Sequence, residues 1–143
     1  MATDRRAEVT WNGSLMEGSG TITSTTSGAI GTQPVSWPNR AEDAPSATSP
    51  EELIAAAHAS CFSMALSAGL SRAGTPPEQL RTSATVTFQP GEGITKIALA
   101  VVGTVPGLDA AGFEEAAQGA KANCPVSKAL ASVPEITLDA SLA

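Results

Sequence analysis

Small and apolar residues dominate one long stretch of the chain, residues 49–73, SPEELIAAAHASCFSMALSAGLSRA. Ser49 suits an N-cap, Pro50 suits the first helical position, and Glu52 follows three residues after the cap. The prolines of GTPPEQL, which comes next, end the pattern. We predict a helix from about Pro50 to Ala73. Its apolar positions recur at i, i+3 and i+4, and we expect a buried stripe of Leu53, Ile54, Ala57, Cys61, Met64, Ala65 and Ala68.

The residues before this helix have the composition of β-structure. Residues 7–37 are rich in Thr, Ser, Val and Gly, and the turn-forming segments EGSG and TSGAIG divide them. This pattern predicts two or three β-strands. The segment 37–50, WPNRAEDAPSATSP, contains three prolines and is predicted to be a loop that leads into the helix.

The residues after the helix return to strand periodicity and then to helix. RTSATVTFQ (81–89) alternates, GEG (91–93) forms a turn, and ITKIALAVVGTV (94–105) completes a β-hairpin. A second helix is predicted within 106–123 with Asp109 as its cap, and CPVSKAL (124–130) begins a shorter one. EITLDASL (135–142) closes the chain as a strand. We therefore expect an α+β fold in which residues 1–143 form a single domain.

The charge balance narrows the range of partners. The chain has 8 Lys and Arg against 14 Asp and Glu, for a net charge of −6, and no basic cluster. This argues against a nucleic acid or an anionic membrane as partner. No apolar run approaches about 18 residues, and no apolar segment follows the charged N-terminus, so we expect neither a transmembrane span nor a secretory signal. The expected location is the cytoplasm.

The chain has two cysteines, and a cytosolic location would keep them reduced. They are core residues, metal ligands or redox-active thiols. Cys61 lies mid-helix on the expected apolar face, where only a nearby cation would favour a thiolate. Cys124 precedes Pro125 and so falls at the N-cap of the short helix, where backbone N–H groups lower a thiol pKa. On local chemistry alone, Cys124 is the more reactive of the two.

Two further residues near Cys61 invite chemical roles. His58, one turn earlier, could pair with Cys61 as a base or join it in binding a metal. The single His and two Cys make a poor zinc set, and no oxyanion hole is visible, so we expect a half-buried His58 at a packed interface. Arg40 is the cation of the loop before the helix. Its alternative role is a surface salt bridge to Glu42 or Asp43.

Three segments together resemble one known family. The helix PEELIAAAHASCFSMAL, the later CPVS and the closing EITLDASL are similar to the osmotically inducible protein C (OsmC) family, and to this branch rather than to the organic hydroperoxide resistance (Ohr) branch. The resemblance extends over essentially the whole chain. It implies the OsmC/Ohr fold: N-terminal antiparallel strands, a long central helix, a β-hairpin, a second helical segment and a C-terminal strand, in an intertwined homodimer with active sites at the subunit interface.

The resemblance also implies an activity in oxidative and osmotic stress defence. The family's members are thiol peroxidases that prefer organic hydroperoxides and need no metal, flavin or haem. Cys61 matches the peroxidatic cysteine, Cys124 the resolving one, Glu51 the glutamate before the reactive cysteine, and Arg40 the arginine that pairs with the thiolate. An external dithiol, of the lipoyl type by analogy with Ohr proteins, would reopen the disulfide. Phe62 and Met64, beside Cys61, suit an organic tail.

Two expectations follow for Cys61. If Arg40 pairs with the thiolate, the Cys61 pKa is depressed. Glu51 lies ten residues before Cys61, about 15 Å along a helix, so either the helix breaks or Glu51 serves the other subunit's site. Two alternatives to a peroxidase remain open: a non-enzymatic thiol redox sensor, and a small-molecule binding module with structural cysteines.

Overall fold

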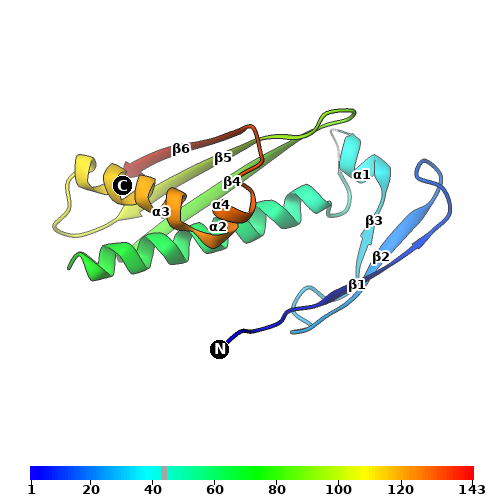
Figure 1. Ribbon diagram of the computed structural model, residues 1–143, viewed down its shortest axis with the longest axis horizontal. Helices are drawn as coiled ribbons and strands as arrows, with labels where there is room; N and C mark the ends of the chain where they lie inside the picture. Colours follow the sequence, from blue (N-terminus) through cyan, green and yellow to red (C-terminus); the bar gives the residue numbers. More distant parts are fainter. Residues whose placement is uncertain (43–44) are drawn as a thin grey trace. The chain divides into compact units, whose positions relative to one another are not determined.

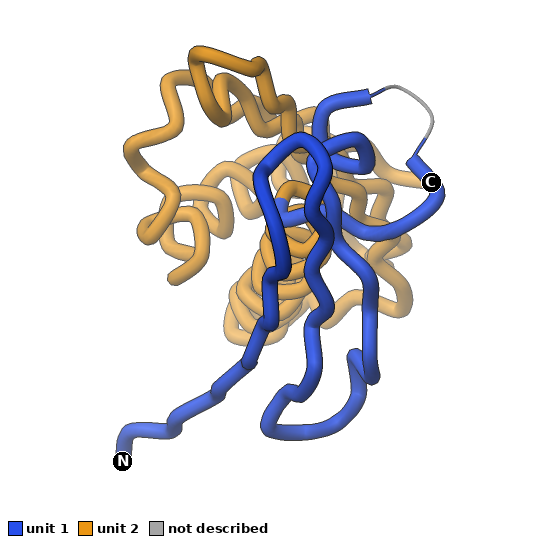
Figure 2. The backbone as a smooth tube through the Cα atoms, turned by 90° about the vertical axis from the view of Figure 1, so that its right-hand side faces the viewer, with its two compact units in different colours: residues 1–50 blue, residues 51–143 orange. Residues whose placement is uncertain are grey.

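The structure of the protein, a computed structural model, describes residues 1–42 and 45–143. Backbone contacts divide the chain into two compact units, Met1–Pro50 and Glu51–Ala143, which are coloured separately in Figure 2. The two units are described one at a time below. The organisation of residues 1–143 as a single domain stays a prediction.

The N-terminal unit is built on a small antiparallel sheet. Its strands are β1 (Ala7–Asn12), β2 (Ser19–Thr25) and β3 (Gln33–Val35), in that order across the sheet (Figure 1). The predicted two or three strands are thus confirmed. The predicted loop 37–50 is partly wrong, because it contains a short helix, α1 (Trp37–Ala41). Ser36 caps this helix by accepting a hydrogen bond from the Asn39 amide at 3.4 Å, and Pro38 is tolerated in its first turn.

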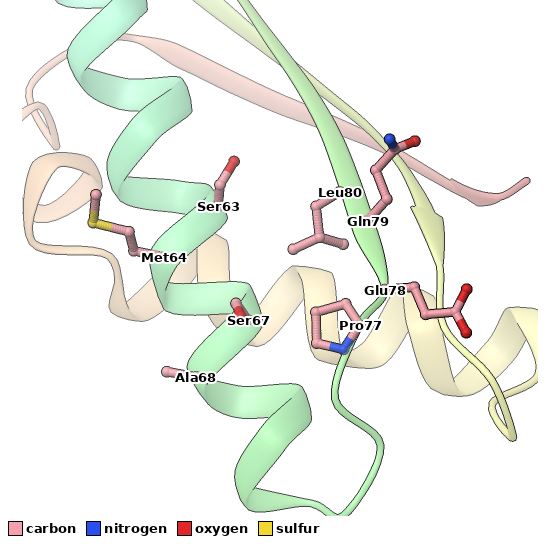
Figure 3. Close-up of a pocket in the computed structure, with 8 residues that line it drawn as sticks. All are labelled: Ser63, Met64, Ser67, Ala68, Pro77, Glu78, Gln79 and Leu80. Carbon is pink, nitrogen blue, oxygen red and sulfur yellow. The ribbon is translucent and has the colours of Figure 1, made fainter.

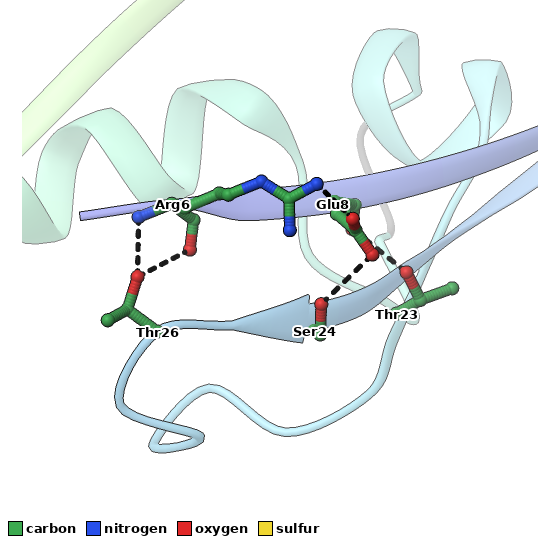
Figure 4. A network of polar contacts seen from close by, with 5 residues as sticks. All are labelled: Arg6, Glu8, Thr23, Ser24 and Thr26. Atoms are coloured by element: carbon green, nitrogen blue, oxygen red, sulfur yellow. Dashed lines mark hydrogen bonds and ion pairs between the residues drawn. The ribbon is translucent and has the colours of Figure 1, made fainter. Parts of the chain in front are cut away.

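Polar side chains tie β1 to β2 (Figure 4). The Arg6 amide donates to the Thr26 hydroxyl at 2.6 Å, and that hydroxyl donates to the Arg6 carbonyl at 3.2 Å. Glu8 is paired with the Arg6 guanidinium, and its carboxylate also accepts from the Ser24 hydroxyl at 3.3 Å. Thr23 donates to the Glu8 carbonyl. These exposed contacts add to the backbone pairing of the two strands, and each contributes little stability in water.

Apolar burial in the N-terminal unit is slight. All six residues of β1 are exposed, including Val9 at 58% and Trp11 at 39%. Among the described residues of this unit, Ile22 is the one buried hydrophobic side chain. A sheet of three short strands needs an apolar face packed against something for stability. The N-terminal unit therefore has little apolar burial of its own.

The C-terminal unit combines a long helix with a three-stranded sheet. The helix α2 (Pro50–Arg72) closely matches the predicted 50–73. β4 (Gln79–Gln89) and β5 (Gly93–Thr104) form the predicted hairpin, with positive φ angles at Gly91 and Gly93 in the turn. Only glycine adopts such angles without strain, which explains the two glycines of GEG.

The chain then crosses over to a third strand. α3 (Ala110–Asn123) begins at the predicted cap, where the Asp109 carboxylate accepts from the Gly112 amide at 2.8 Å. α4 (Pro125–Ala129) follows directly, and β6 (Glu135–Leu142) pairs parallel to β5. A parallel neighbour requires such a helical crossover. The predicted second helical segment and C-terminal strand are confirmed.

The core of this unit lies where α2 and α3 cover one face of the sheet (Figure 1). The central strand β5 contributes alternate side chains, Ile97, Leu99 and Val101, all at most 1% exposed. On α3, the Phe113 ring lies so close to Gly103 of β5 that a Cβ there would come within 2.5 Å of it. Glycine at this strand position therefore makes room for the aromatic ring.

The buried face of α2 differs from the predicted stripe. The buried residues are Glu51, His58, Phe62, Leu66 and Leu70, whereas Met64 is 72% exposed. The prediction was wrong because α2 carries apolar or small residues on all sides, so spacing alone does not select a face. The serines at 60, 63, 67 and 71 share one face of the helix, which excludes His58, Phe62 and Leu66, so this polar face was the available signal.

The length of α2 is also relevant to whether the chain contains a membrane-spanning helix. By length and composition α2 could cross a membrane, with a mean hydropathy of 1.5, contrary to the expectation that no segment would qualify. Core helices of soluble proteins meet the same criterion. Because Phe62, Leu66 and Leu70 pack in the core with β5 and α3, we interpret α2 as a core helix.

Candidate active site

The two cysteines meet although they are far apart in the sequence. Cys61 lies in the middle of α2, Cys124 joins α3 to α4, and their thiols are hydrogen-bonded to each other. The Cys124 backbone is held on both sides, since its N–H donates to the Ala120 carbonyl at 2.8 Å and its carbonyl accepts from the Lys128 amide at 3.0 Å. Cys124 is the N-cap residue of α4, as predicted. The arrangement brings together two reduced sulfurs that could form a disulfide.

The two thiols have opposite acid–base tendencies. Burial raises the pKa of Cys61, and donation of its hydrogen bond to Cys124 raises it further, while the Val126 amide acts in the other direction. Burial also raises the pKa of Cys124, but the hydrogen bond from Cys61 and the amide and hydroxyl groups of Ser127 outweigh it, so the pKa of Cys124 is lowered. The pKa of Cys124 is lowered although its side chain makes no regular capping hydrogen bond to α4. The predicted depression of the Cys61 pKa is therefore wrong for the chain as described, whereas the prediction for Cys124 is confirmed.

The two thiols also differ in access. Cys124 is fully buried, whereas Cys61 is partly exposed. A molecule from solvent can contact Cys61, but it cannot contact Cys124 without a movement of the chain. An oxidant would therefore meet Cys61 first, even though Cys124 is the more acidic thiol.

His58 is more deeply placed than the sequence predicted. It is fully buried instead of half-buried, and its Nε2 lies 2.7 Å from the Ser127 hydroxyl on α4. Burial lowers the pKa of His58, so the ring is neutral. Its Nδ1 has no hydrogen-bond partner among the described residues. A direct His58–Cys61 pair is therefore not formed, and the described residues contain no group of three ligands that could hold a metal ion.

Glu51 and Arg40, which are predicted to act with Cys61, belong to different units of the chain. Glu51 is 6% exposed at the start of α2. The helix runs without interruption from Glu51 to Cys61, which excludes the predicted alternative of a break between them. Arg40 lies in α1 of the N-terminal unit and is partly buried. The roles of Arg40 and Glu51 stay predictions, and Asp43, an alternative partner of Arg40, lies outside the described residues.

An open groove begins two residues beyond Cys61 along α2 (Figure 3). Its volume is about 530 Å³, and its walls come from α2 and from the chain entering β4: Ser63, Met64, Ser67, Ala68, Pro77, Glu78, Gln79 and Leu80. Met64 is exposed beside it, but Phe62 is fully buried in the core. The prediction that Phe62 faces an organic tail is therefore wrong, and only Met64 remains available.

Sequence reasoning missed Ser127. Ser127 is 7% exposed and links His58 to Cys124, yet in the sequence it is one serine among many. Its position three residues after an N-cap was the available signal, because the N–H at that position faces the cap side chain.

The comparisons with known proteins bear on the whole chain. The family described as OsmC-like protein matches residues 42–139, a segment that contains Glu51, Cys61 and Cys124 but not Arg40. The chain is 46% identical to peroxiredoxin OsmC of Escherichia coli (strain K12), over 99% of both chains. A protein of the same name from Shigella flexneri gives the same identity and coverage.

Solved structures agree on the fold. The organic hydroperoxide resistance protein OhrB of Bacillus subtilis is 25% identical, with a TM-score of 0.65 over 96% of this chain and 98% of that one. An organic hydroperoxide resistance protein of Elizabethkingia anophelis is 21% identical, with a TM-score of 0.68 over 100% and 99% of the two chains, and this likeness shows the fold alone. The expected α+β fold is confirmed, and with it the family: this chain belongs to the OsmC family.

Proposed function

We propose that this chain is a cysteine-dependent peroxidase that reduces hydroperoxides in stress defence, with Cys61 as the peroxidatic and Cys124 as the resolving residue. The observation that carries the proposal is the pair of hydrogen-bonded thiols, one in a partly exposed residue and one in a buried residue, in a chain 46% identical to a peroxiredoxin. An oxidant reaches Cys61, and the second sulfur is already beside it.

The cycle has three balanced steps. The Cys61 thiolate attacks one oxygen of the O–O bond, that bond breaks, and the alkoxide leaves as an alcohol after taking a proton, so Cys61 becomes a sulfenic acid. Cys124 then attacks the Cys61 sulfur, the S–O bond breaks, and water leaves as the disulfide forms. An external dithiol reopens the disulfide by exchange and is itself oxidised.

Arg40 and Glu51 complete the proposed machinery. Because burial raises the pKa of Cys61, formation of a thiolate there needs a cation, and the family resemblance assigns this role to Arg40. A buried carboxylate such as Glu51 is tolerated when it is paired, and it would orient the guanidinium. Arg40→Ala should slow the oxidation of Cys61 by peroxide at neutral pH. An unchanged second-order rate constant would remove Arg40 from the site.

We further propose that the active form is a homodimer. The exposed apolar side chains Val9 and Trp11 on β1 and Met64 on α2 would then be covered by a second copy. The continuous α2 supports the same conclusion, since Glu51 cannot reach the Cys61 of its own chain across about 15 Å. Sedimentation of the purified chain tests this proposal, and a monomer at catalytic concentrations would contradict it.

The proposed substrate is an organic hydroperoxide, and the proposed reductant is a dithiol of the lipoyl type. The groove beside Met64 offers apolar surface to an organic tail. The test measures peroxide consumption by the purified chain with excess dihydrolipoamide, comparing cumene hydroperoxide with hydrogen peroxide. We expect turnover with both and a higher kcat/KM for the organic peroxide. Equal kcat/KM values would contradict the preference but not the peroxidase.

The same assay separates the peroxidase from the other two functions considered. A redox sensor would oxidise once and need no sustained turnover, and a binding module would not consume peroxide. Absence of turnover with every dithiol would favour one of these. The cytoplasmic location, where such a thiol cycle is kept reduced, stays a prediction.

A further inference from the structure

Four side chains form a continuous polar path through the C-terminal unit. His58 Nε2 lies 2.7 Å from the Ser127 hydroxyl, this hydroxyl lies beside the Cys124 sulfur, and Cys124 is hydrogen-bonded to Cys61. The first three residues are almost completely excluded from solvent, with exposures of 0%, 7% and 0%. Buried hydrogen-bonded chains of this kind have defined donors and acceptors, because water is not present to replace a misdirected bond.

The surroundings of His58 select one tautomer. If Nδ1 carried the proton, a buried N–H would have no acceptor among the described residues, and orphaned buried donors are rare. The Ser127 hydroxyl would also have to donate to Nε2 and could not donate to Cys124. With the proton on Nε2, the ring donates to Ser127 Oγ and the hydroxyl hydrogen is directed to the Cys124 sulfur. Only this tautomer gives every N–H and O–H group of the path an acceptor.

We propose that His58 is a positioning residue of the peroxidase cycle, which acts through Ser127 to direct a hydrogen bond onto Cys124 and keep that sulfur ready to attack the Cys61 sulfenic acid. This inference rests on the proposed function. In the step it serves, the Cys124 sulfur supplies the electron pair of the new S–S bond. The S–O bond of the sulfenic acid breaks, and the departing hydroxide takes a proton to leave as water.

Other ionisable groups lie on the helices that carry the path. Cys61 faces Cys124 from α2, and Glu51 lies two turns before His58 on the buried face of that helix. Lys121 lies in the last turn of α3, and the exposed Lys128 lies on α4. A test of Cys124 therefore has to remove the titration of Cys61 while it leaves these groups unchanged.

The Cys61→Ser background meets this requirement. It leaves Cys124 as the chain's single thiol and keeps a hydroxyl at position 61 that can donate as the thiol did. Thiolate absorbance against pH then reports Cys124 alone. Hydrogen bonds to a charged group are strong enough that removing one should lower the thiolate fraction about tenfold at a pH below the pKa. We expect this change in Ser127→Ala and a change in the same direction in His58→Phe.

Two variants sharpen the test. His58→Gln should restore the titration curve towards that of the parent, because an amide N–H can donate to the Ser127 hydroxyl in place of the ring. Ser132→Ala removes an exposed hydroxyl beyond α4 and should leave the curve unchanged. If Ser127→Ala and His58→Phe titrate like the parent while circular dichroism shows them folded, the inference is overturned, whatever peroxidase activity the native chain has.

The native protein offers a measurement that needs no variant. His58 is the only histidine of the chain, so the nitrogen chemical shifts of its ring can be assigned directly. We expect the Nε2–H tautomer at neutral pH, and the Nδ1–H tautomer would overturn the inference. In the cycle itself, Ser127→Ala should slow disulfide formation about tenfold after a pulse of peroxide, with the first oxidation of Cys61 unchanged. Equal slowing of both steps would contradict a role in positioning Cys124.

Discussion

At the scale of single residues, His58 combines complete burial with a ring nitrogen that lacks a hydrogen-bond partner in the described part of the chain. Burial lowers its pKa, so the folded protein binds this proton less readily than the unfolded chain does. The unfolded histidine takes up a proton below about pH 6.5. The stability that His58 contributes is therefore present above this pH and is lost as the pH falls below it.

This predicts an acid-sensitive free energy of unfolding. Between pH 7 and pH 5 the native chain should lose up to about 1.4 kcal/mol per pH unit from this one residue, on top of the contribution of other groups. His58→Gln has no such titration, and its stability should depend less steeply on pH. Urea denaturation at several pH values measures both slopes, and equal slopes would show that His58 titrates alike in both states.

At the scale of elements, the accuracy of the sequence predictions depended on local signals. β6 and the Asp109 cap of α3 could be predicted because strand alternation and helix capping depend on residues that are adjacent in the sequence. The helix α1 was missed because its prolines suggested a loop, although Pro38 in the first turn and the Ser36 cap are compatible with a helix. The limits of α2 were predictable from Pro50 and the later prolines. The spacing of apolar residues selected the wrong buried face, although the four serines of the helix share one face and mark the side away from the core.

In the candidate site, too, features set by neighbouring residues could be predicted, and features set by tertiary contacts could not. The N-cap position of Cys124 could be predicted from Pro125, and its lowered pKa with it. The link from His58 to Ser127 could not, because it joins residues that are distant in sequence and depends on how α4 packs against α2. The raised pKa of Cys61 likewise follows from burial and from its contact with Cys124, which no local pattern contains.

The observed face of α2 predicts which substitutions destabilise the fold. Leu66 is fully buried in the core, so Leu66→Ala should reduce the free energy of unfolding by about 3 kcal/mol. Met64→Ala, on the same helix but at a 72% exposed position, should change it by less than about 1 kcal/mol when measured on the monomer. Denaturation at low protein concentration compares the two. Similar losses would favour the stripe expected from spacing over the observed face.

At the scale of the whole molecule, the proposed homodimer predicts complementation between inactive variants. Glu51→Ala and Cys61→Ser should each be inactive alone. If Glu51 serves the Cys61 of the other chain, a heterodimer of the two variants holds one site with both native residues and one site with neither. Unfolding the variants together and refolding them should therefore recover half of the native activity per heterodimer.

The control for this experiment is Glu51→Ala refolded with itself, which should stay inactive. Heterodimers are confirmed by giving one variant a separable tag. If heterodimers are present and no activity returns, Glu51 and Cys61 do not share a site across two chains, and the dimer has no such catalytic role.

The central claim is that Cys61 is oxidised first and Cys124 resolves it, and counting thiols after one equivalent of cumene hydroperoxide tests this most directly. The native chain should lose both of its thiols and gain a disulfide that a dithiol reverses. Cys124→Ser should stop at a sulfenic acid that dimedone traps, and Cys61→Ser should keep its remaining thiol reduced, since Cys124 is fully buried. Oxidation of Cys124 in the Cys61→Ser protein at the native rate would contradict the account.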